Sequence, residues 1–174
     1  RFSPEFNLAL TAAFEHFTAL MAETFFGRAD VMAGADRRMQ ALFAWHAIEE
    51  MEHRSVAFDV MKKVGKVGYF KRSAALLYGT WQTTVTMLRS ADQLLAADGF
   101  SRAERIAMFA RNWKWMYGKN GVLSAFLPQL VAYLKPGFHP EDIPVMQNYG
   151  AWIAAYQRTL DPMQACDALM AAAR

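Results

Sequence analysis

Cysteine is nearly absent from this chain of 174 residues, in which Cys166 is the single thiol. No disulfide framework can form within the chain, and Cys166, which lies in an alanine-rich stretch, is predicted to be a buried core residue. Long hydrophobic runs are absent too. The longest uncharged run, 73–88, has 16 residues, fewer than the roughly 20 apolar residues that span a bilayer. We expect this run to form a buried core helix.

An excess of charge of one sign is also missing, since the formal net charge is +3 and the pI is about 9.1. A nucleic-acid-binding domain usually carries a denser concentration of Lys and Arg, so we expect a small-molecule substrate and no nucleic-acid partner. Five basic residues are compatible with a peripheral membrane contact through anionic headgroups, but they are more typical of a solvated connection between helices. They are Lys62, Lys63, Lys66, Lys71 and Arg72.

No signal segment with basic residues followed by an apolar stretch opens the sequence, which starts at Arg1 without a methionine. We therefore expect a cytoplasmic location and a chain that is a fragment of a longer protein. Hydrophobic residues make up 54% of the sequence, which is enough for one domain, 1–174, with a sizeable core.

Helical signals follow one another along the chain, and no alternating strand pattern occurs. Serine followed by proline at residues 3 and 4 predicts a helix start, and the Ser101–Glu104 spacing predicts a capping box. We predict an all-α fold in which 1–65 is a helix pair and 66–174 supplies additional core helices. The expected helices cover 4–26, 36–65, 69–97, 101–118, 122–134 with a kink at Pro128, 144–159 and 162–173.

Ionisable residues lie where the second of these helices should be apolar. At about 100° per residue, His46, Glu49, Glu50 and His53 share an arc of roughly 100° that continues into apolar positions such as Leu42. Buried charges without partners cost several kcal/mol or more. A divalent metal ion is the partner that satisfies carboxylate oxygen and imidazole nitrogen together.

The first helix contributes a further carboxylate, Glu15, at the centre of a narrow face of small residues that lets another helix approach closely. Glu50 and His53 have the Glu-x-x-His spacing, which places both side chains one helical turn apart. A Glu from one helix and a Glu-x-x-His from another form half of a ferritin-like dimetal site. We predict Glu15, Glu50 and His53 as metal ligands, with His46 as a further ligand. The small residues are Thr11, Ala12, Thr18, Ala19 and Ala22.

Structural roles compete with these functional ones. His46 could be a core histidine and Glu49 a solvated helix charge. We expect Glu52 to be solvated. We expect His16 either to have a structural role or to hydrogen-bond to a metal ligand without binding the metal itself. Three further expectations concern other parts of the chain. Asp59 pairs with Arg54 or Lys63, His139 caps a helix or lies in a loop, and Trp113 and Trp115 pack in the core.

Three segments carry a resemblance to a known family: ALTAAFEHFTA (9–19), WHAIEEMEHRSVAFDV (45–60) and FHP (138–140). In these segments the sequence resembles the bacterial predicted metal-dependent hydrolase family. The resemblance implies that Glu15, Glu50 and His53 match that family's ligands, with His46 and Glu49 as further candidates. It also implies a C-terminal portion of such a protein, because members carry an upstream acid-bearing helix and a Gln-Glu-x-x-His helix.

The expected activity is metal-dependent hydrolysis with Glu49 as general base, and the expected cofactor is a divalent metal, iron first, with manganese or zinc as alternatives. One alternative is a diiron oxidase or oxygenase acting on an apolar substrate, and another is a metal-free helical interaction domain. Fold analogy does not decide between them. An incomplete ferritin-like bundle would be completed by the upstream half of the same protein or by a homodimer.

Overall fold

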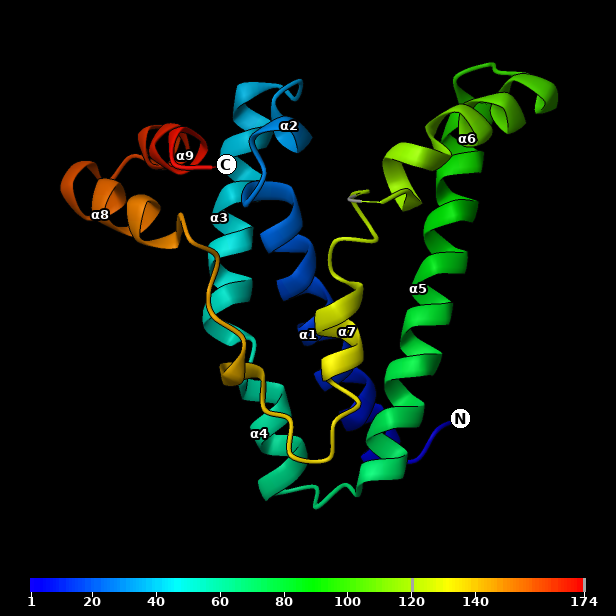
Figure 1. Ribbon diagram of the computed structural model, residues 1–174, viewed down its shortest axis with the longest axis vertical. Helices are drawn as coiled ribbons and strands as arrows, with labels where there is room; N and C mark the ends of the chain where they lie inside the picture. Colours follow the sequence, from blue (N-terminus) through cyan, green and yellow to red (C-terminus); the bar gives the residue numbers. More distant parts are fainter. Residues whose placement is uncertain (120, 174) are drawn as a thin grey trace.

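The computed structural model describes residues 1–119 and 121–173, and within these ranges the only regular elements are helices (Figure 1). The all-α prediction is confirmed. The helices are α1 (Pro4–Phe26), α2 (Ala29–Met32), α3 (Arg37–His53), α4 (Val56–Lys63), α5 (Tyr69–Ala97), α6 (Arg102–Tyr117), α7 (Leu127–Ala132), the 3-10 helix η1 (Pro140–Asp142), α8 (Tyr149–Thr159) and α9 (Pro162–Ala171).

The predicted helix starts are confirmed by hydrogen bonds at their caps. The Ser3 hydroxyl accepts from the backbone N–H of Phe6 at 3.2 Å at the start of α1. At the start of α6, the Glu104 carboxylate accepts from the backbone N–H of Ser101 at 2.8 Å, which completes the capping box. These side chains satisfy backbone donors that the first turn of a helix leaves without partners.

The long helix predicted over 36–65 is wrong in one respect, because it breaks into α3 and α4 at Arg54 and Ser55. The Arg54 guanidinium donates to the backbone carbonyl of Met51 at 2.9 Å, and Ser55 donates to Glu141 at 3.2 Å. The break lets the two helices bury their apolar faces in different core clusters, with Met51 in one and Phe58 in the other.

Two further boundaries differ from the prediction. Pro128 does not kink a helix over 122–134; it lies in the first turn of α7, where its missing N–H costs nothing. The helix expected over 144–159 begins only at Tyr149. Asn148 precedes it with a buried side chain that donates to the backbone carbonyls of Phe26 and Leu169 at 2.7 and 3.0 Å, and this contact fixes the chain in a non-helical approach to α8.

Helix α1 lies at the centre of the molecule and packs against α3, α4 and α5 (Figure 1). Close approach of α1 to α3 is possible because both helices present alanines. Ala19 and Ala22 of α1 are buried in the same cluster as Ala44 and Ala47 of α3. Since α1 contributes to both core clusters, it connects the α3–α9 side of the molecule to the α4–α5–α7 side.

The run 73–88 is helical as predicted, but most of its residues are not buried. Only Ala75, Leu76 and Gly79 of this run are buried, whereas Leu77 and Trp81 are about 60% exposed. None of the helices that the structure describes is both long and apolar enough to cross a membrane.

Arg72 departs from the expected solvated connection because it is 1% exposed. Its guanidinium lies 5.2–5.6 Å from the ring centroids of Phe58, Tyr69 and Tyr133 and donates to the backbone carbonyl of Lys135 at 2.7 Å. Aromatic faces attract a guanidinium through their quadrupole. The three rings therefore stabilise the buried charge of Arg72, a role that a carboxylate often has. Burial lowers the pKa of Arg72 from its usual value.

Candidate metal centre

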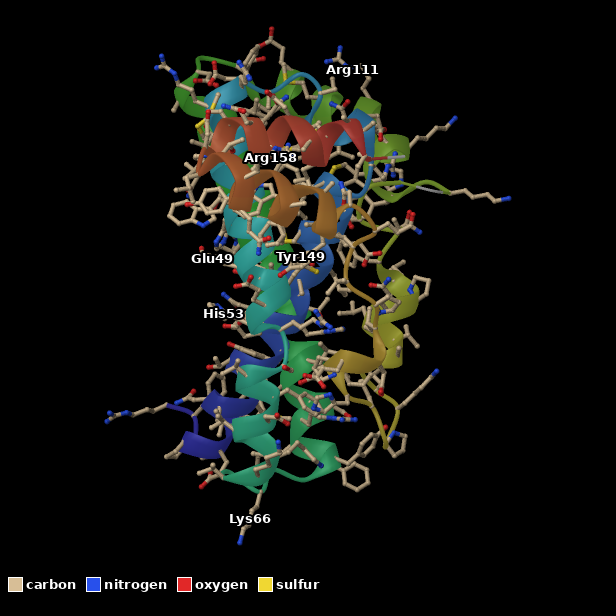
Figure 2. The ribbon with its side chains drawn as sticks, turned by 90° about the vertical axis from the view of Figure 1, so that its left-hand side faces the viewer. Glu49, His53, Lys66, Arg111, Tyr149 and Arg158 are labelled. Carbon is tan, nitrogen blue, oxygen red and sulfur yellow. The ribbon has the colours of Figure 1, made fainter. Side chains whose placement is uncertain are left out.

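The predicted ligands on α3 lie on one face of that helix. His46 Nε2 lies 3.3 Å from a carboxylate oxygen of Glu50, and His46 Nδ1 lies 3.9 Å from one of Glu49. Figure 2 shows Glu49 and His53 projecting from α3 on the side away from the chain segment that leads from α7 to α8. The face opposite to them carries the buried residues of α3, such as Ala44 and Ile48.

Helix α1 brings a second carboxylate to this face. The pKa of Glu15 is raised from its usual value, first by burial and then by the negative charge of Glu50, while the nearby His53 opposes the rise. The Thr18 hydroxyl, one turn further along α1, donates to Glu50 at 2.5 Å. Glu15, Glu50 and His53 therefore interact across the α1–α3 contact, and Thr18 fixes one oxygen of Glu50.

The donor chemistry of this cluster suits a divalent ion, since it offers carboxylate oxygens and imidazole nitrogens from two packed helices. Within residues 1–119 and 121–173, however, no three His, Cys, Asp or Glu side chains come together in a group that could hold a metal ion. The four predicted ligands, Glu15, Glu50, His53 and His46, lie on the same surface, but their side chains do not converge on one position that a metal ion could occupy. Their assignment as ligands stays a prediction.

The surface around these residues is open and partly apolar. His46, Glu49 and His53 are exposed, whereas Glu15 and Glu50 are half-buried. Large apolar side chains of the same helices are also exposed, and in most soluble monomers such patches are small. They are Phe14 of α1 and Met39, Leu42, Phe43 and Trp45 of α3.

The competing structural roles are confirmed for several residues outside this face. His16 is buried between Tyr133 and Phe138, with ring centroids at 4.9 and 5.3 Å, and its Nε2 lies 3.4 Å from the backbone carbonyl of Gln129. Desolvation lowers the pKa of His16 to about 4, so this histidine is a neutral core residue.

His139 precedes η1 as predicted, and its Nδ1 accepts from the backbone N–H of Glu141 at 3.3 Å. Its other ring nitrogen lies 3.2 Å from Asp59, which also pairs with Lys63 at 2.9 Å. Glu52 is exposed and accepts a hydrogen bond from Tyr149 at 3.1 Å. Cys166 is buried, and burial raises the pKa of its thiol.

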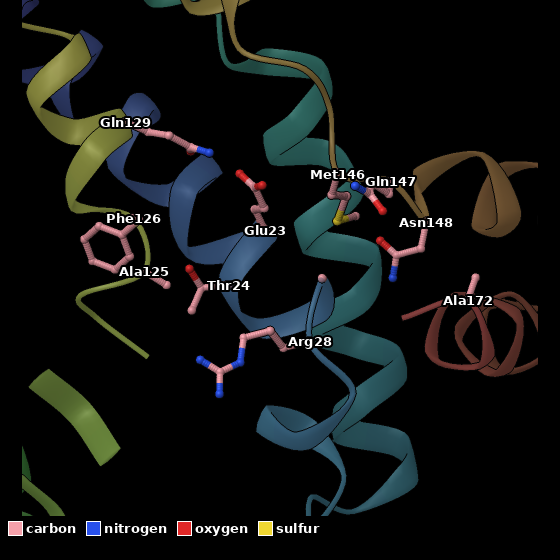
Figure 3. A pocket seen from close by; sticks show the side chains of 11 residues that line it. Glu23, Thr24, Arg28, Ala125, Phe126, Gln129, Met146, Gln147, Asn148 and Ala172 are labelled. Carbon is pink, nitrogen blue, oxygen red and sulfur yellow. The ribbon is translucent and has the colours of Figure 1, made fainter. Parts of the chain in front are cut away.

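A cavity of about 280 Å³, lined by both polar and apolar side chains, lies on another side of α1 (Figure 3). Glu23 and Thr24 face it from α1, Gln129 from α7, and Gln147 and Asn148 from the approach to α8. The sequence gives no sign of this cavity, because its lining comes from segments that are distant in the sequence and that no motif or periodicity links. Among the described residues, Oε1 of Gln129 and Oδ1 of Asn148 are buried without a hydrogen-bond partner.

The chain was compared with known protein families, curated proteins and solved structures. No curated protein and no solved structure matches the chain. A family model described as predicted metal-dependent hydrolase matches residues 1–143, a range that runs from α1 to the residue after η1 and includes Glu15, His46, Glu50 and His53. Because the match covers most of the chain, this protein belongs to the family of predicted metal-dependent hydrolases.

Proposed function

We propose that this protein hydrolyses a small-molecule substrate with a divalent metal ion held by Glu15, Glu50 and His53, with His46 as a further ligand. The observation that carries the proposal is the α1–α3 contact itself. It sets a carboxylate whose pKa is raised by burial beside a second carboxylate and a histidine. A cation at this position would relieve the repulsion between Glu15 and Glu50.

The residues of the face divide into those that bind and those that move protons. When bound, a divalent ion lowers the pKa of a coordinated water and polarises a carbonyl or phosphoryl oxygen. Glu49 is exposed and lies beside His46, which supports its proposed role as the general base that accepts a proton from water. Thr18 restricts Glu50 through its hydrogen bond and keeps one carboxylate oxygen turned toward α1.

The exposed apolar side chains around the face support a substrate with an apolar part. Phe14 is 39% exposed and Leu42 is 54% exposed, and both come from the helices that carry the ligands. A substrate with an apolar part would bury these side chains as its reactive group approaches Glu49. The match to a family of predicted hydrolases supports a hydrolytic reaction.

A diiron oxidase or oxygenase is the second candidate. The carboxylate-rich donor set and the Glu-x-x-His spacing on α3 favour it, because ferritin-like dimetal sites use these groups, and the apolar surroundings suit an apolar substrate. Iron is the first metal to test under either function, with manganese and zinc as alternatives.

Two helices supply only half of a four-helix dimetal site. We propose that the exposed face of α1 and α3 is completed either by the upstream half of the same protein or by a second copy. The exposure of Leu42 and Phe43 beside the ligands supports this, because an added pair of helices would bury both side chains.

The first test replaces His53 with alanine. We expect metal content after growth in metal-replete medium to fall about 10-fold or more, because Glu15 and Glu50 lose the imidazole that shares their counter-charge. Glu52→Ala is the matched control, since Glu52 lies one residue away on α3 and bonds to Tyr149 instead. Full metal occupancy in His53→Ala, or no metal in the wild type, would overturn the site.

The second test separates the two reactions. A hydrolase should keep its activity when zinc replaces iron, whereas an oxidase needs a metal that changes oxidation state. Glu49→Gln should retain metal and lose hydrolytic turnover, because the amide cannot accept the proton. An oxygen-dependent product formed by the iron protein alone would reject hydrolysis in favour of the oxidase.

A further inference from the structure

Helix α6 is held to the rest of the molecule mainly by one neighbour. The structure describes every residue of α6 and buries none of them. Its main packing contact is with α5, and Figure 1 shows the two helices forming an arm whose end lies far from α4. An amphipathic helix normally buries its apolar stripe, so a helix of 16 residues without a buried residue requires an explanation.

The apolar residues of α6 are large and exposed. Trp113 is 60% exposed and Ile106 is 59% exposed, and their spacing of seven positions, with Tyr117 four further on, places all three on one side of the helix. The rings of Trp113 and Tyr117 lie 4.5 Å apart between centroids. Trp115, on another side of α6, is 49% exposed. The expectation that both tryptophans pack in the core is therefore wrong.

The charge of α6 is strongly positive. Four basic residues and one acidic residue give this helix a net charge of +3, which equals the formal net charge of the whole chain. Arg105 pairs with Asp92 of α5 at 2.7 Å. The other three basic residues, Arg102, Arg111 and Lys114, are exposed and form no ion pair with any described residue. Their charge is available to an anionic surface.

A groove of about 940 Å³ separates α5 from α6, and its walls are mostly apolar. Leu88 and Leu95 line it from α5, and Phe109, Trp113 and Met116 from α6. The groove therefore continues the exposed apolar side of α6 inward, next to the unpaired basic residues. Acyl chains bind such apolar walls when the headgroups beside them meet basic side chains.

We propose that α6 docks on a lipid surface that contains anionic headgroups. Trp113, Tyr117 and Ile106 enter the boundary between headgroups and acyl chains, where indole and phenol rings are favoured, while Arg111 and Lys114 pair with lipid phosphates. A second copy fits this surface less well, because two faces that each carry a net charge of +3 repel one another. The helix lies on the membrane and does not cross it.

The test measures co-sedimentation of the purified protein with vesicles. We expect binding to vesicles of phosphatidylcholine with 30 mol% phosphatidylglycerol, on the order of 10-fold weaker binding to pure phosphatidylcholine, and weakening as salt is raised. The double variant Arg111→Glu/Lys114→Glu should reduce binding to the anionic vesicles at least 10-fold. Trp113→Ala should also reduce it and should reduce the blue shift of tryptophan fluorescence on vesicle addition, to which the exposed Trp115 also contributes.

Lys62→Glu/Lys66→Glu is the matched control, because it makes the same charge change in the other basic stretch of the chain and leaves α6 intact. Circular dichroism should show the same helical content in every variant. Equal loss of binding in the control pair, equal binding to neutral vesicles, or no binding by the wild type would overturn the proposal. So would a change of oligomeric state in Trp113→Ala without vesicles, since the surface would then belong to a second copy. The amount of metal bound by the protein should be the same in all of these variants, because none of them changes a proposed ligand on α1 or α3.

Discussion

Neighbouring ionisable residues of α1 lie in opposite environments. Glu15 is half-buried at the contact with α3 and has charged neighbours there, whereas His16, about 100° further round the helix, is enclosed by aromatic rings. Burial raises the pKa of the carboxyl and lowers the pKa of the imidazole, since both shifts disfavour a buried charge. Two adjacent residues of one helix thus differ in environment, because Glu15 lies at a partly exposed helix contact and His16 lies in the core.

His16 should make the stability of the protein sensitive to acid. Its pKa of about 4 in the fold lies below the usual 6.5, so its contribution is fully present above pH 6.5 and is lost as the pH falls toward 4. A shift of this size corresponds to roughly 3 kcal/mol. Urea unfolding at pH 7 and pH 4.5 should show a clearly smaller loss in His16→Leu than in the wild type.

Phe17→Leu is the control for this experiment, since it changes a neighbouring core side chain and removes no titratable group. It should lower the free energy of unfolding by a similar amount at both pH values. If His16→Leu loses as much free energy of unfolding on acidification as the wild type, the assignment of His16 as a buried neutral residue is wrong.

At the scale of elements, a buried amide adds a polar link between α1 and the C-terminal helices, which also share an apolar core cluster with α1. The Asn148 side chain donates to the last residue of α1 and to α9, so it joins three parts of the chain that pack at the α3 side. Backbone carbonyls at helix C-termini lack partners within their own helix. Asn148, which is 3% exposed, supplies a donor to the Phe26 carbonyl and a second donor to the Leu169 carbonyl, which also accepts from the backbone N–H of Ala172.

Asn148→Leu should lower the free energy of unfolding by about 1–3 kcal/mol, because the Phe26 carbonyl would lose its side-chain donor and the Leu169 carbonyl would keep only the backbone N–H of Ala172. Thermal unfolding followed by circular dichroism measures the change. Gln147→Ala, at the exposed adjacent position, should change stability by less than about 0.5 kcal/mol. Wild-type stability of Asn148→Leu would show that these hydrogen bonds contribute little.

At the scale of the whole molecule, the exposed face of α1 and α3 should couple metal binding to association. We expect sedimentation velocity to show a larger fraction of dimer after ferrous iron or zinc is added, since two half-sites related by a twofold axis would supply four helices. Leu42→Glu should reduce both association and metal affinity, because it puts a charge beside His46 at the surface to be covered.

Val64→Glu is the control, as Val64 is 75% exposed at the end of α4. It should leave association and metal binding unchanged. A monomer that binds metal tightly through Glu15, Glu50 and His53 would contradict the half-site. If residues upstream of the chain complete the site, a longer protein should instead bind metal tightly as a monomer.

The sequence by itself determined the class of fold and most helix boundaries. Local interactions fix these features, as Ser3 and the Ser101–Glu104 capping box show. It also placed Glu50 and His53 on one side of a helix, because helical periodicity defines which residues share a side, whereas the structure shows that Glu15 of α1 lies near both. The family resemblance is confirmed by the match to residues 1–143. The metal-ligand assignment and the ferritin-like arrangement stay predictions.

Only the tertiary structure decided which apolar and charged residues are buried. Arg72 is enclosed by aromatic rings that come from distant segments, whereas Trp113 and Trp115 belong to α6, which has no buried residue, and both remain exposed. The break at Arg54 likewise depends on tertiary packing, because α3 and α4 pack in two separate core clusters. Periodicity specifies the side of a helix on which a residue lies, but burial requires a partner surface, and long-range packing alone supplies one.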